Sequence, residues 1–238
     1  IPQIAELPRL TAQLKDANWA LAAAAVGFSL LTYVGSAMAL SSSVARRIPV
    51  ARATLVALAG SFVNRVTPAK VGGMALNLRF LQKSGVPTAV ASASIGLYSI
   101  VGAITHITLL IIFSFWAGKA VNLADLLPGN AILIAVAGIV LGLIGVIAFV
   151  PKVRTFIAEK VRPEAVKVRA NLQELLQHPV RMVLIVVGSA ILTLSYIWAL
   201  DVSIKAFGGE IALPVVAVIY LAGASIASAA PTPGGVGA

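Results

Sequence analysis

Long stretches without charge decide the fold class of this chain. Residues 18–40, 131–150 and 182–200 each contain no Asp, Glu, Lys or Arg. A helix needs about 20 apolar residues to cross roughly 30 Å of hydrocarbon, so each stretch is predicted to be a spanning helix. Residues 86–117 are uncharged apart from a proton that His106 could carry. This stretch is long for one crossing, so we expect it to tilt, bend or begin outside the hydrocarbon.

The composition agrees with an all-α integral membrane protein, a polytopic helical bundle. With 59% hydrophobic residues, 11% charged residues and a mean hydropathy of +0.99, the chain cannot cover a soluble globule with polar surface. The absence of Cys excludes disulfides, thiolate metal sites and a cysteine nucleophile. Two His residues are too few and too far apart to suggest a metal site. We predict no metal and no cofactor.

The net charge of +10 could suggest nucleic acid, but the positions of the charges argue against that partner. Most of the 18 basic residues fall in loops on one side of the predicted helices, and an excess of Lys and Arg marks the cytoplasmic side. The loops on the other side contain most of the acidic residues, and three Trp residues fall at the outer helix ends. The 14 basic residues assigned to the cytoplasm are Arg46, Arg47, Arg52, Arg65, Lys70, Arg79, Lys83, Lys152, Arg154, Lys160, Arg162, Lys167, Arg169 and Arg181.

An internal repeat adds a second constraint. Residues 58–75 read LAGSFVNRVTPAKVGGMA and residues 221–238 read LAGASIASAAPTPGGVGA. The separation of Pro68 and Pro231 along the chain equals that of Gly72 and Gly235, and we call this separation the repeat offset. A repeat of this kind indicates a fold built from two related units, here near 50–86 and 211–238.

The flanking charges predict how the two repeats enter the membrane. Basic residues flank the first repeat on both sides, so it should be a re-entrant hairpin that opens to the cytoplasm. The second repeat follows Glu210 on the outer side and should dip in from there. Three predicted crossings separate the repeats, so we expect two inverted re-entrant hairpins, each broken by Pro and Gly. Inverted repeats with interrupted helices near the midplane are typical of transporters.

The residues at the breaks suggest an anion site. Gly residues let a ligand approach the backbone, and the free N–H groups at the start of a half-helix favour negative charge. We expect the amides beyond Gly72 to be uncapped. A phosphate-bearing lipid headgroup is the simplest partner, although the Pro and Gly residues could serve only to shape the hairpins, with the cations as topology charges. The candidate headgroup-binding residues are Asn64, Arg65, Thr67, Lys70, Gly72, Gly73, Arg79, Thr232, Gly234 and Gly235.

These motifs resemble a known family. The order N-R-x-T-P-x-x-x-G-G at 64–73, a Leu-x-x-x-Gly-Val stretch at 81–86 and a terminal P-x-P-G-G-x-G are similar to the transmembrane domain of the lysylphosphatidylglycerol synthase family. The resemblance covers roughly residues 19–238. It implies a flippase-like module in the inner membrane of bacteria or archaea, which in some members is fused to a synthase domain.

Three further features leave alternatives open. His106 is an intramembrane ionisable residue, which suggests a titrating functional group, yet a neutral His bonded to a neighbouring helix explains it equally well. Asp201 and Lys205 have the spacing of a local helical ion pair. The cytoplasmic segment 152–179 has an apolar stripe with basic neighbours, as in an interfacial helix, but it could also be a surface connector.

The sequence shows no nucleophile with a base and acid, so no catalytic residues are predicted and the chain is not expected to be an enzyme. We expect 1–238 to be one transmembrane domain cut from a longer chain. The main hypothesis is a multi-pass protein of the bacterial inner membrane that binds a phospholipid or polyprenyl-phosphate-type lipid and moves its headgroup between leaflets. The alternatives are a non-transporting accessory subunit of an envelope-lipid complex and a lipid-modifying enzyme whose catalytic part lies elsewhere. Partners among other copies of the chain or envelope proteins stay open.

Overall fold

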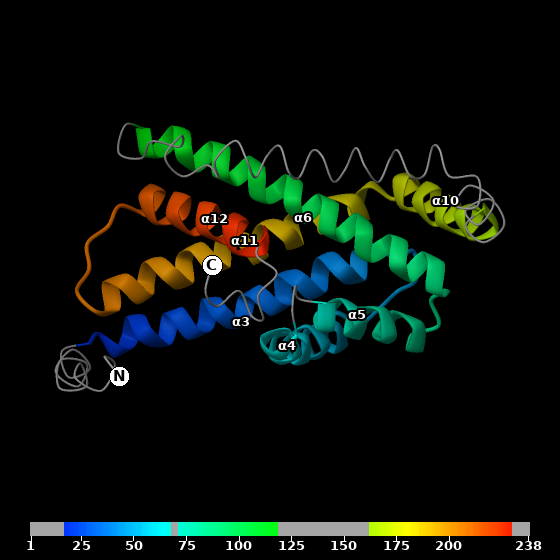
Figure 1. Ribbon diagram of the computed structural model, residues 1–238, viewed down its shortest axis with the longest axis horizontal. Helices are drawn as coiled ribbons and strands as arrows, with labels where there is room; N and C mark the ends of the chain where they lie inside the picture. The colour runs from blue at the N-terminus through cyan, green and yellow to red at the C-terminus, as the bar shows by residue number, and fades with distance from the viewer. Residues whose placement is uncertain (1–16, 68–70, 119–161, 230–238) are drawn as a thin grey trace.

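The computed structural model describes residues 17–67, 71–118 and 162–229, without the side chains of 162–168 and 226–229. Every regular element in these ranges is an α-helix, which confirms the predicted fold class (Figure 1). The helices are α3 (Trp19–Ser42), α4 (Val50–Val66), α5 (Val71–Lys83), α6 (Thr88–Ala117), α10 (Arg162–Gln177), α11 (Pro179–Ala206) and α12 (Leu213–Ala229).

Three of the described helices, α3, α6 and α11, are long and apolar enough to cross a membrane. They coincide with the predicted spans at 18–40, 86–117 and 182–200, whereas the predicted span at 131–150 lies outside the described residues. Helix α11 extends past both charged ends of its predicted span. It begins with Pro179 in its first turn and ends before Gly208, whose positive φ of 77° terminates the helix.

Helices α3 and α11 run antiparallel along most of their lengths (Figure 1). The side chain of Asn18 caps the start of α3, and its backbone N–H donates to the carbonyl of Ala206 at the end of α11 at 2.8 Å. At the opposite end, the Arg181 guanidinium in the first turn of α11 donates to the carbonyl of Val44. The start of each helix therefore lies beside the end of the other.

Two glycines allow the backbones of α3 and α11 to touch. A Cβ atom on Gly35 would lie 2.7 Å from the carbonyl oxygen of Gly188 and 2.6 Å from the amide nitrogen of Leu192. A Cβ atom on Gly188 would lie 2.7 Å from the amide nitrogen of Ala39. Backbone atoms cannot rotate away as side chains can, so only Gly fits at these positions. Small residues at such contacts are the usual basis of helix packing in membranes.

The positions of the helix ends follow the same repeat offset as the Pro and Gly residues, and each repeated unit therefore contains two helices. Helix α4 covers 50–66 and α12 covers 213–229, so both pairs of ends are separated by the repeat offset, like the Pro and Gly residues. Helix α3 shifted by the same offset falls within α11. The first unit is therefore α3–α4 and the second is α11–α12. Because α3 and α11 are antiparallel, the two units are inverted relative to each other.

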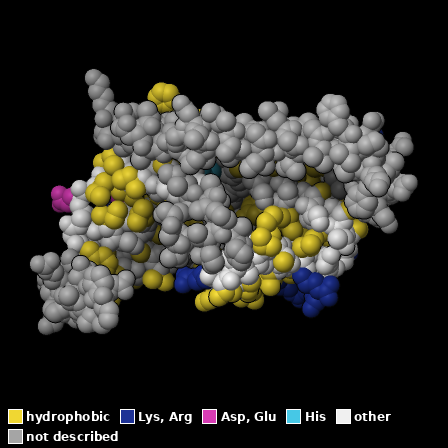
Figure 2. All heavy atoms as spheres, viewed as in Figure 1, with side chains coloured by type: hydrophobic (Ala, Val, Ile, Leu, Met, Phe, Trp, Pro, Cys, Tyr) yellow, Lys and Arg dark blue, Asp and Glu magenta, His cyan; other side chains and the backbone are white. Residues whose placement is uncertain are grey.

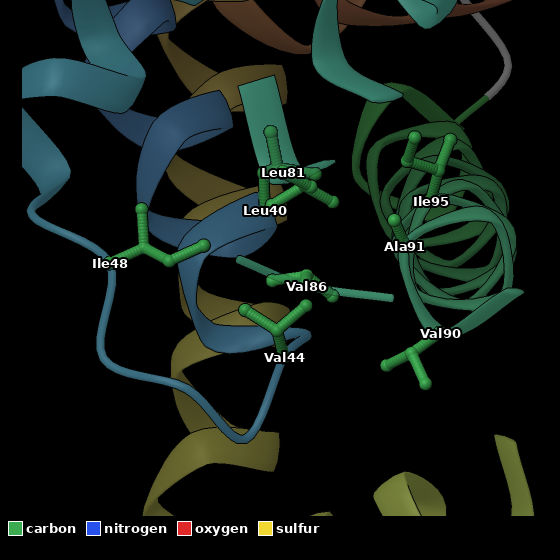
Figure 3. Close-up of a cluster of buried hydrophobic side chains, with 8 residues drawn as sticks. All are labelled: Leu40, Val44, Ile48, Leu81, Val86, Val90, Ala91 and Ile95. Carbon is green, nitrogen blue, oxygen red and sulfur yellow. The ribbon is translucent and has the colours of Figure 1, made fainter. Parts of the chain in front are cut away.

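Two apolar clusters stabilise opposite ends of the bundle. The first joins the end of α3, helix α5 and the start of α6 (Figure 3). Its central side chains, Leu40 and Leu81, are fully buried. The second cluster joins α6, α11 and α12 around Phe113, Ile197 and Leu221. Helices α4 and α5 lie toward the half of the molecule in which α6 begins, and α12 lies in the other half (Figure 1).

Charge follows the same division. Figure 2 shows Lys and Arg side chains gathered over the half that contains α4 and α5, and an acidic side chain at the opposite end. The exposed rings of Trp19 and Trp116 lie at the start of α3 and the end of α6, which belong to this opposite end. Aromatic rings at a helix end suit the headgroup layer. The predicted cytoplasmic side corresponds to the α4–α5 end.

The α4–α5 pair is a helical hairpin of 17 and 13 residues. Each helix is shorter than the about 20 residues that one crossing needs. The hairpin is therefore compatible with a re-entrant segment, and its depth in the membrane stays a prediction. Helix α10 docks on the protein through the buried side chains of Asn171 and Leu175, while Leu172 and Leu176 are exposed. These contacts favour the connector over a helix that only rests on lipid.

The glycine contact gives a direct stability test. We expect Gly35→Ala and Gly188→Ala each to destabilise the protein by at least about 1–3 kcal/mol, the usual cost of overpacking, because each methyl group would press on backbone atoms. Gly27→Ala is the matched control in α3, because nothing lies within 4 Å of its Cβ position. It should be neutral or stabilising by up to about 1 kcal/mol. Thermal unfolding in detergent measures all three, and equal effects would contradict the backbone contact.

Candidate functional site

The break after α4 is held together by two side chains from the end of that helix. The Asn64 Oδ1 atom accepts a hydrogen bond from the Gly73 amide at 2.7 Å. The Thr67 hydroxyl accepts one from the Gly72 amide at 3.2 Å and donates to the carbonyl of Val63 at 2.9 Å. Thr67 itself is extended, as expected for a residue before Pro. The end of α4 therefore caps the start of α5.

This capping corrects one expectation from the sequence. The motif predicts uncapped amides beyond the break, but those of Gly72 and Gly73 are already bonded within the hairpin. Asn64, Thr67 and the two glycines are brought together as predicted, yet they bond one another. Their role as headgroup ligands stays a prediction, and Lys70, Thr232, Gly234 and Gly235 lie outside the described residues.

The two glycines are required by the same close approach. A Cβ atom on Gly72 would lie 2.4 Å from Val63 Cγ1, and one on Gly73 would lie 2.5 Å from Asn64 Nδ2. Farther along the hairpin, a Cβ atom on Gly60 would be 3.5 Å from the Cα atom of Gly73. The glycine-rich motif thus brings α4 and α5 into backbone contact.

A groove with a cationic edge lies between α4 and α5. Its volume is about 320 Å³, and hydrocarbon side chains form most of its wall. Arg79 and Lys83, one helical turn apart on α5, supply its two cations, and both are exposed. Among the described residues, neither forms an ion pair. An acyl chain could occupy the apolar part while its phosphate meets the cations. Arg65 is also exposed but does not line this groove.

His106 contacts the second repeat unit. Its Nε2 atom lies 2.9 Å from the carbonyl oxygen of Leu221 and 3.2 Å from the Ser225 hydroxyl, both on α12. A carbonyl oxygen can only accept, so Nε2 is the protonated nitrogen. The Ser225 hydroxyl also donates to the Leu221 carbonyl at 2.8 Å. This arrangement is the interhelical His bond that the sequence left open, whereas its titration stays a prediction.

A second cavity opens beside His106, between α6, α11 and α12. Its volume is about 470 Å³. Of the residues in this region, the sequence analysis predicts a functional role for His106 but does not predict the aromatic residues of the cavity wall. That part is formed by Tyr98, Tyr196 and Tyr220. One signal could have found Tyr196, because Leu-Thr-Tyr at 31–33 and Leu-Ser-Tyr at 194–196 are again separated by the repeat offset.

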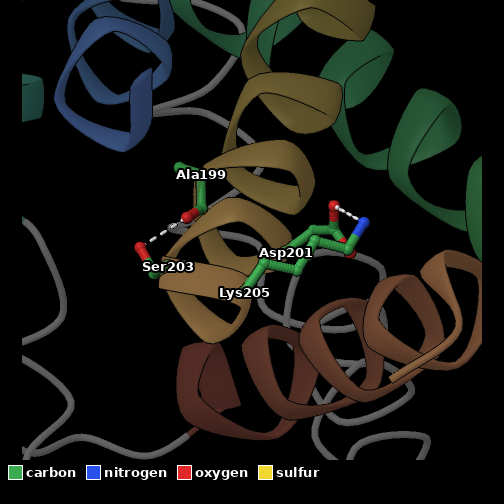
Figure 4. Close-up of polar contacts among 4 residues, drawn as sticks. All are labelled: Ala199, Asp201, Ser203 and Lys205. Carbon is green, nitrogen blue, oxygen red and sulfur yellow. Dashed lines mark hydrogen bonds and ion pairs between the residues drawn. The ribbon is translucent and has the colours of Figure 1, made fainter. Parts of the chain in front are cut away.

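The predicted pair of Asp201 and Lys205 is confirmed. The Lys205 Nζ atom donates to Asp201 Oδ2 at 2.8 Å within the last turns of α11 (Figure 4). The Asp201 side chain is buried and that of Lys205 is half exposed. The neighbouring Ser203 hydroxyl donates to the carbonyl of Ala199, so it belongs to the helix itself. The other carboxylate oxygen, Asp201 Oδ1, is buried and has no hydrogen-bond partner among the described residues.

The Asn64 cap can be tested separately from any ligand. We expect Asn64→Ala to lower stability by about 0.5–2 kcal/mol, the usual cost of removing an N-cap, because the Gly73 amide loses its acceptor. Asn77→Ala in the middle of α5 is the control, since Asn77 makes no side-chain hydrogen bond to the described residues. Thermal unfolding compares the two. A larger loss in Asn77→Ala would contradict the capping role.

Comparison with known proteins gives one match. The profile of the family described as "Lysylphosphatidylglycerol synthase TM region" matches residues 5–238. No curated protein and no solved structure matches. Since the match spans essentially the whole sequence, as the motifs at 64–73 and 231–237 suggested, this chain belongs to the lysylphosphatidylglycerol synthase transmembrane-region family.

Proposed function

We propose that this chain is a flippase-like membrane protein that binds an anionic or phosphate-bearing lipid and moves its headgroup between the two leaflets. The observation that carries the proposal is the inverted pair of units, α3–α4 and α11–α12, whose helix boundaries follow the repeat offset. Inverted units can offer one site to either face of a membrane by exchanging conformations. Family membership supports a lipid-related role in a multi-pass protein.

The α4–α5 groove supports an anionic ligand. Its apolar wall suits an acyl chain, and Arg79 and Lys83 suit a phosphate. Because the hairpin is predicted to lie on the cytoplasmic side, its groove would bind lipid from the cytoplasmic leaflet of a bacterial inner membrane. In this proposal the chain performs no covalent chemistry and needs no cofactor.

Lipid movement tests the function itself. The purified chain is reconstituted into phosphatidylcholine vesicles with a trace of fluorescent phosphatidylglycerol, and dithionite is added outside. We expect the protected inner-leaflet fluorescence to be lost in vesicles with protein and retained in empty ones. Retention in both would exclude autonomous transport and favour the accessory subunit.

The cationic groove is tested by lipid retention. We expect Arg79→Gln/Lys83→Gln to lower retention of phosphatidylglycerol relative to phosphatidylcholine by about tenfold or more, because each cation near an anionic surface contributes about 1 kcal/mol. Native mass spectrometry measures retained lipid. Arg52→Gln, an exposed cation on α4 outside the groove, is the control and should change little. Arg65→Gln tests the cation beside the break. A loss confined to Arg65→Gln would move the anion site from the groove to the break.

Membrane topology tests the re-entrant hairpin. We expect Arg47→Cys and Ser84→Cys, which flank α4–α5, to react with an impermeant maleimide only from the inside. Glu210→Cys, between α11 and α12, should react only from the outside. Reaction of the first two from opposite sides would make the hairpin a true crossing and would remove the inversion on which the proposal depends.

A further inference from the structure

The cavity beside His106 lies near the middle of the two longest spanning helices. Gly102 and His106 line it from the centre of α6, and Ser189 and Thr193 line it from the centre of α11. Helix α11 carries Arg181 and Lys205 near its two ends, so we expect its centre to lie near the bilayer midplane. A polar wall at that depth is costly unless it serves a ligand or a wet cavity.

The described part of the wall is rich in hydroxyl groups. Three of the chain's four tyrosines line it, together with hydroxyls of Ser and Thr, and none of the described lining residues is Lys, Arg, Asp or Glu. The rings of Tyr196 and Tyr220 stack at 5.6 Å, which fixes them against each other. The Tyr98 hydroxyl is 3.1 Å from the Ser36 hydroxyl of α3. The aromatic side of the cavity is therefore pre-formed.

Two hydroxyls at this wall lack hydrogen-bond partners among the described residues. The Ser189 hydroxyl is buried and unpaired, although the Ser203 hydroxyl of the same helix donates to a carbonyl one turn back. The Tyr220 hydroxyl likewise bonds to none of the described residues, and its ring contact with Tyr196 does not use it. The Ser189 hydroxyl is closed off from the cavity by its own burial. The hydroxyl of Tyr220, whose side chain is half-buried, is therefore the one left to bond to a polar occupant of the cavity.

The chemistry of the wall selects the occupant. A phosphate near the midplane would need cations and an ammonium group would need carboxylates, and the described lining residues include no Lys, Arg, Asp or Glu. Uncharged hydroxyl groups can both donate to and accept from Tyr and Ser hydroxyls without a charged partner. The volume of about 470 Å³ falls within the range of small-molecule pockets, about 300–1,000 Å³.

We propose that this cavity binds the uncharged, hydroxyl-bearing part of a lipid headgroup, such as glycerol or a sugar, and thereby selects which lipid is moved. The inference rests on the proposed function in taking a membrane lipid as the ligand. In this proposal the cations of the α4–α5 groove bind the phosphate of the lipid, and the hydroxyls of this cavity bind its polyol.

Matched lipids separate hydroxyl recognition from charge. Phosphatidylglycerol and phosphatidylethanol both carry one negative charge, but only the first has headgroup hydroxyls. We expect the wild-type chain in phosphatidylcholine nanodiscs to retain phosphatidylglycerol about tenfold more than phosphatidylethanol, as measured by native mass spectrometry. Tyr220→Phe should lower this ratio by about fivefold, since one hydroxyl contributes about one net hydrogen bond.

Tyr33→Phe is the control, because Tyr33 holds the position of Tyr196 in the other unit and lies outside the cavity. It should leave the ratio unchanged. Thermal unfolding checks that each variant is folded, and Thr193→Val removes a second lining hydroxyl if Tyr220→Phe unfolds. A wild-type ratio near one, or an unchanged ratio in both Tyr220→Phe and Thr193→Val, would overturn the inference.

Two further arms define the ligand. Free glycerol or glucose should not displace phosphatidylglycerol at concentrations that leave the nanodisc intact, and displacement by either would make the ligand a soluble polyol and overturn the lipid assignment. Movement of fluorescent lipids without headgroup preference would overturn this inference while leaving the proposed flippase intact. Preferential retention of phosphatidylglycerol without lipid movement between leaflets would support binding in the cavity and contradict the proposed flippase function.

Discussion

The direct contact between the backbones of α3 and α11 is the constraint on which the rest of the structure depends. Lipid surrounds apolar side chains as favourably as a neighbouring helix does, so two spanning helices associate through close packing rather than through the hydrophobic effect. Gly35 and Gly188 provide that packing, because neither position can hold a methyl group without moving backbone atoms of the other helix. The contact fixes the antiparallel axis about which the two repeated units are arranged. Helices α4 and α12, which follow α3 and α11 in the chain, lie in different halves of the molecule (Figure 1).

A second constraint acts on the α4–α5 hairpin. Backbone N–H and C=O groups that a helix break leaves without partners must form other hydrogen bonds, because lipid offers none. The first amides of α5 have no partner within their own helix, and the Asn64 and Thr67 side chains satisfy two of them. The glycines at 72 and 73 are what let these side chains come close enough. The same residues that suggest a ligand site in the sequence therefore first serve the fold. Arg79 and Lys83 bond to no described residue and lie at the edge of the α4–α5 groove.

Much of the fold can be predicted because charge-free length is a direct physical signal. The uncharged stretches at 18–40 and 182–200 lie within or overlap α3 and α11. Helix α11 extends farther at both ends because its charged residues have partners there, Arg181 on the Val44 carbonyl and Lys205 on Asp201. Pro and Gly are distinctive enough to reveal the repeat, but its extension to α3 and α11 rests on residues such as Tyr33 that look ordinary in an apolar helix.

The cavity could not be predicted, since its tyrosines come from three helices whose packing the sequence does not give. The capping by Asn64 is equally hidden, because the motif is consistent with both a bonded and a free backbone amide.

The two units share a sequence pattern but differ at one position that matters for the cavity. In the first unit the Tyr33 hydroxyl donates to the Ser61 hydroxyl of α4 at 3.2 Å, which ties the two helices together. The same offset places Tyr196 opposite Ala224 in the second unit, and a methyl group cannot accept that hydrogen bond. Tyr196 instead stacks on Tyr220, and both rings, with Ala224, face the cavity. The hydrogen bond that ties α3 to α4 in the first unit therefore has no counterpart between α11 and α12, and the corresponding positions in the second unit line a cavity.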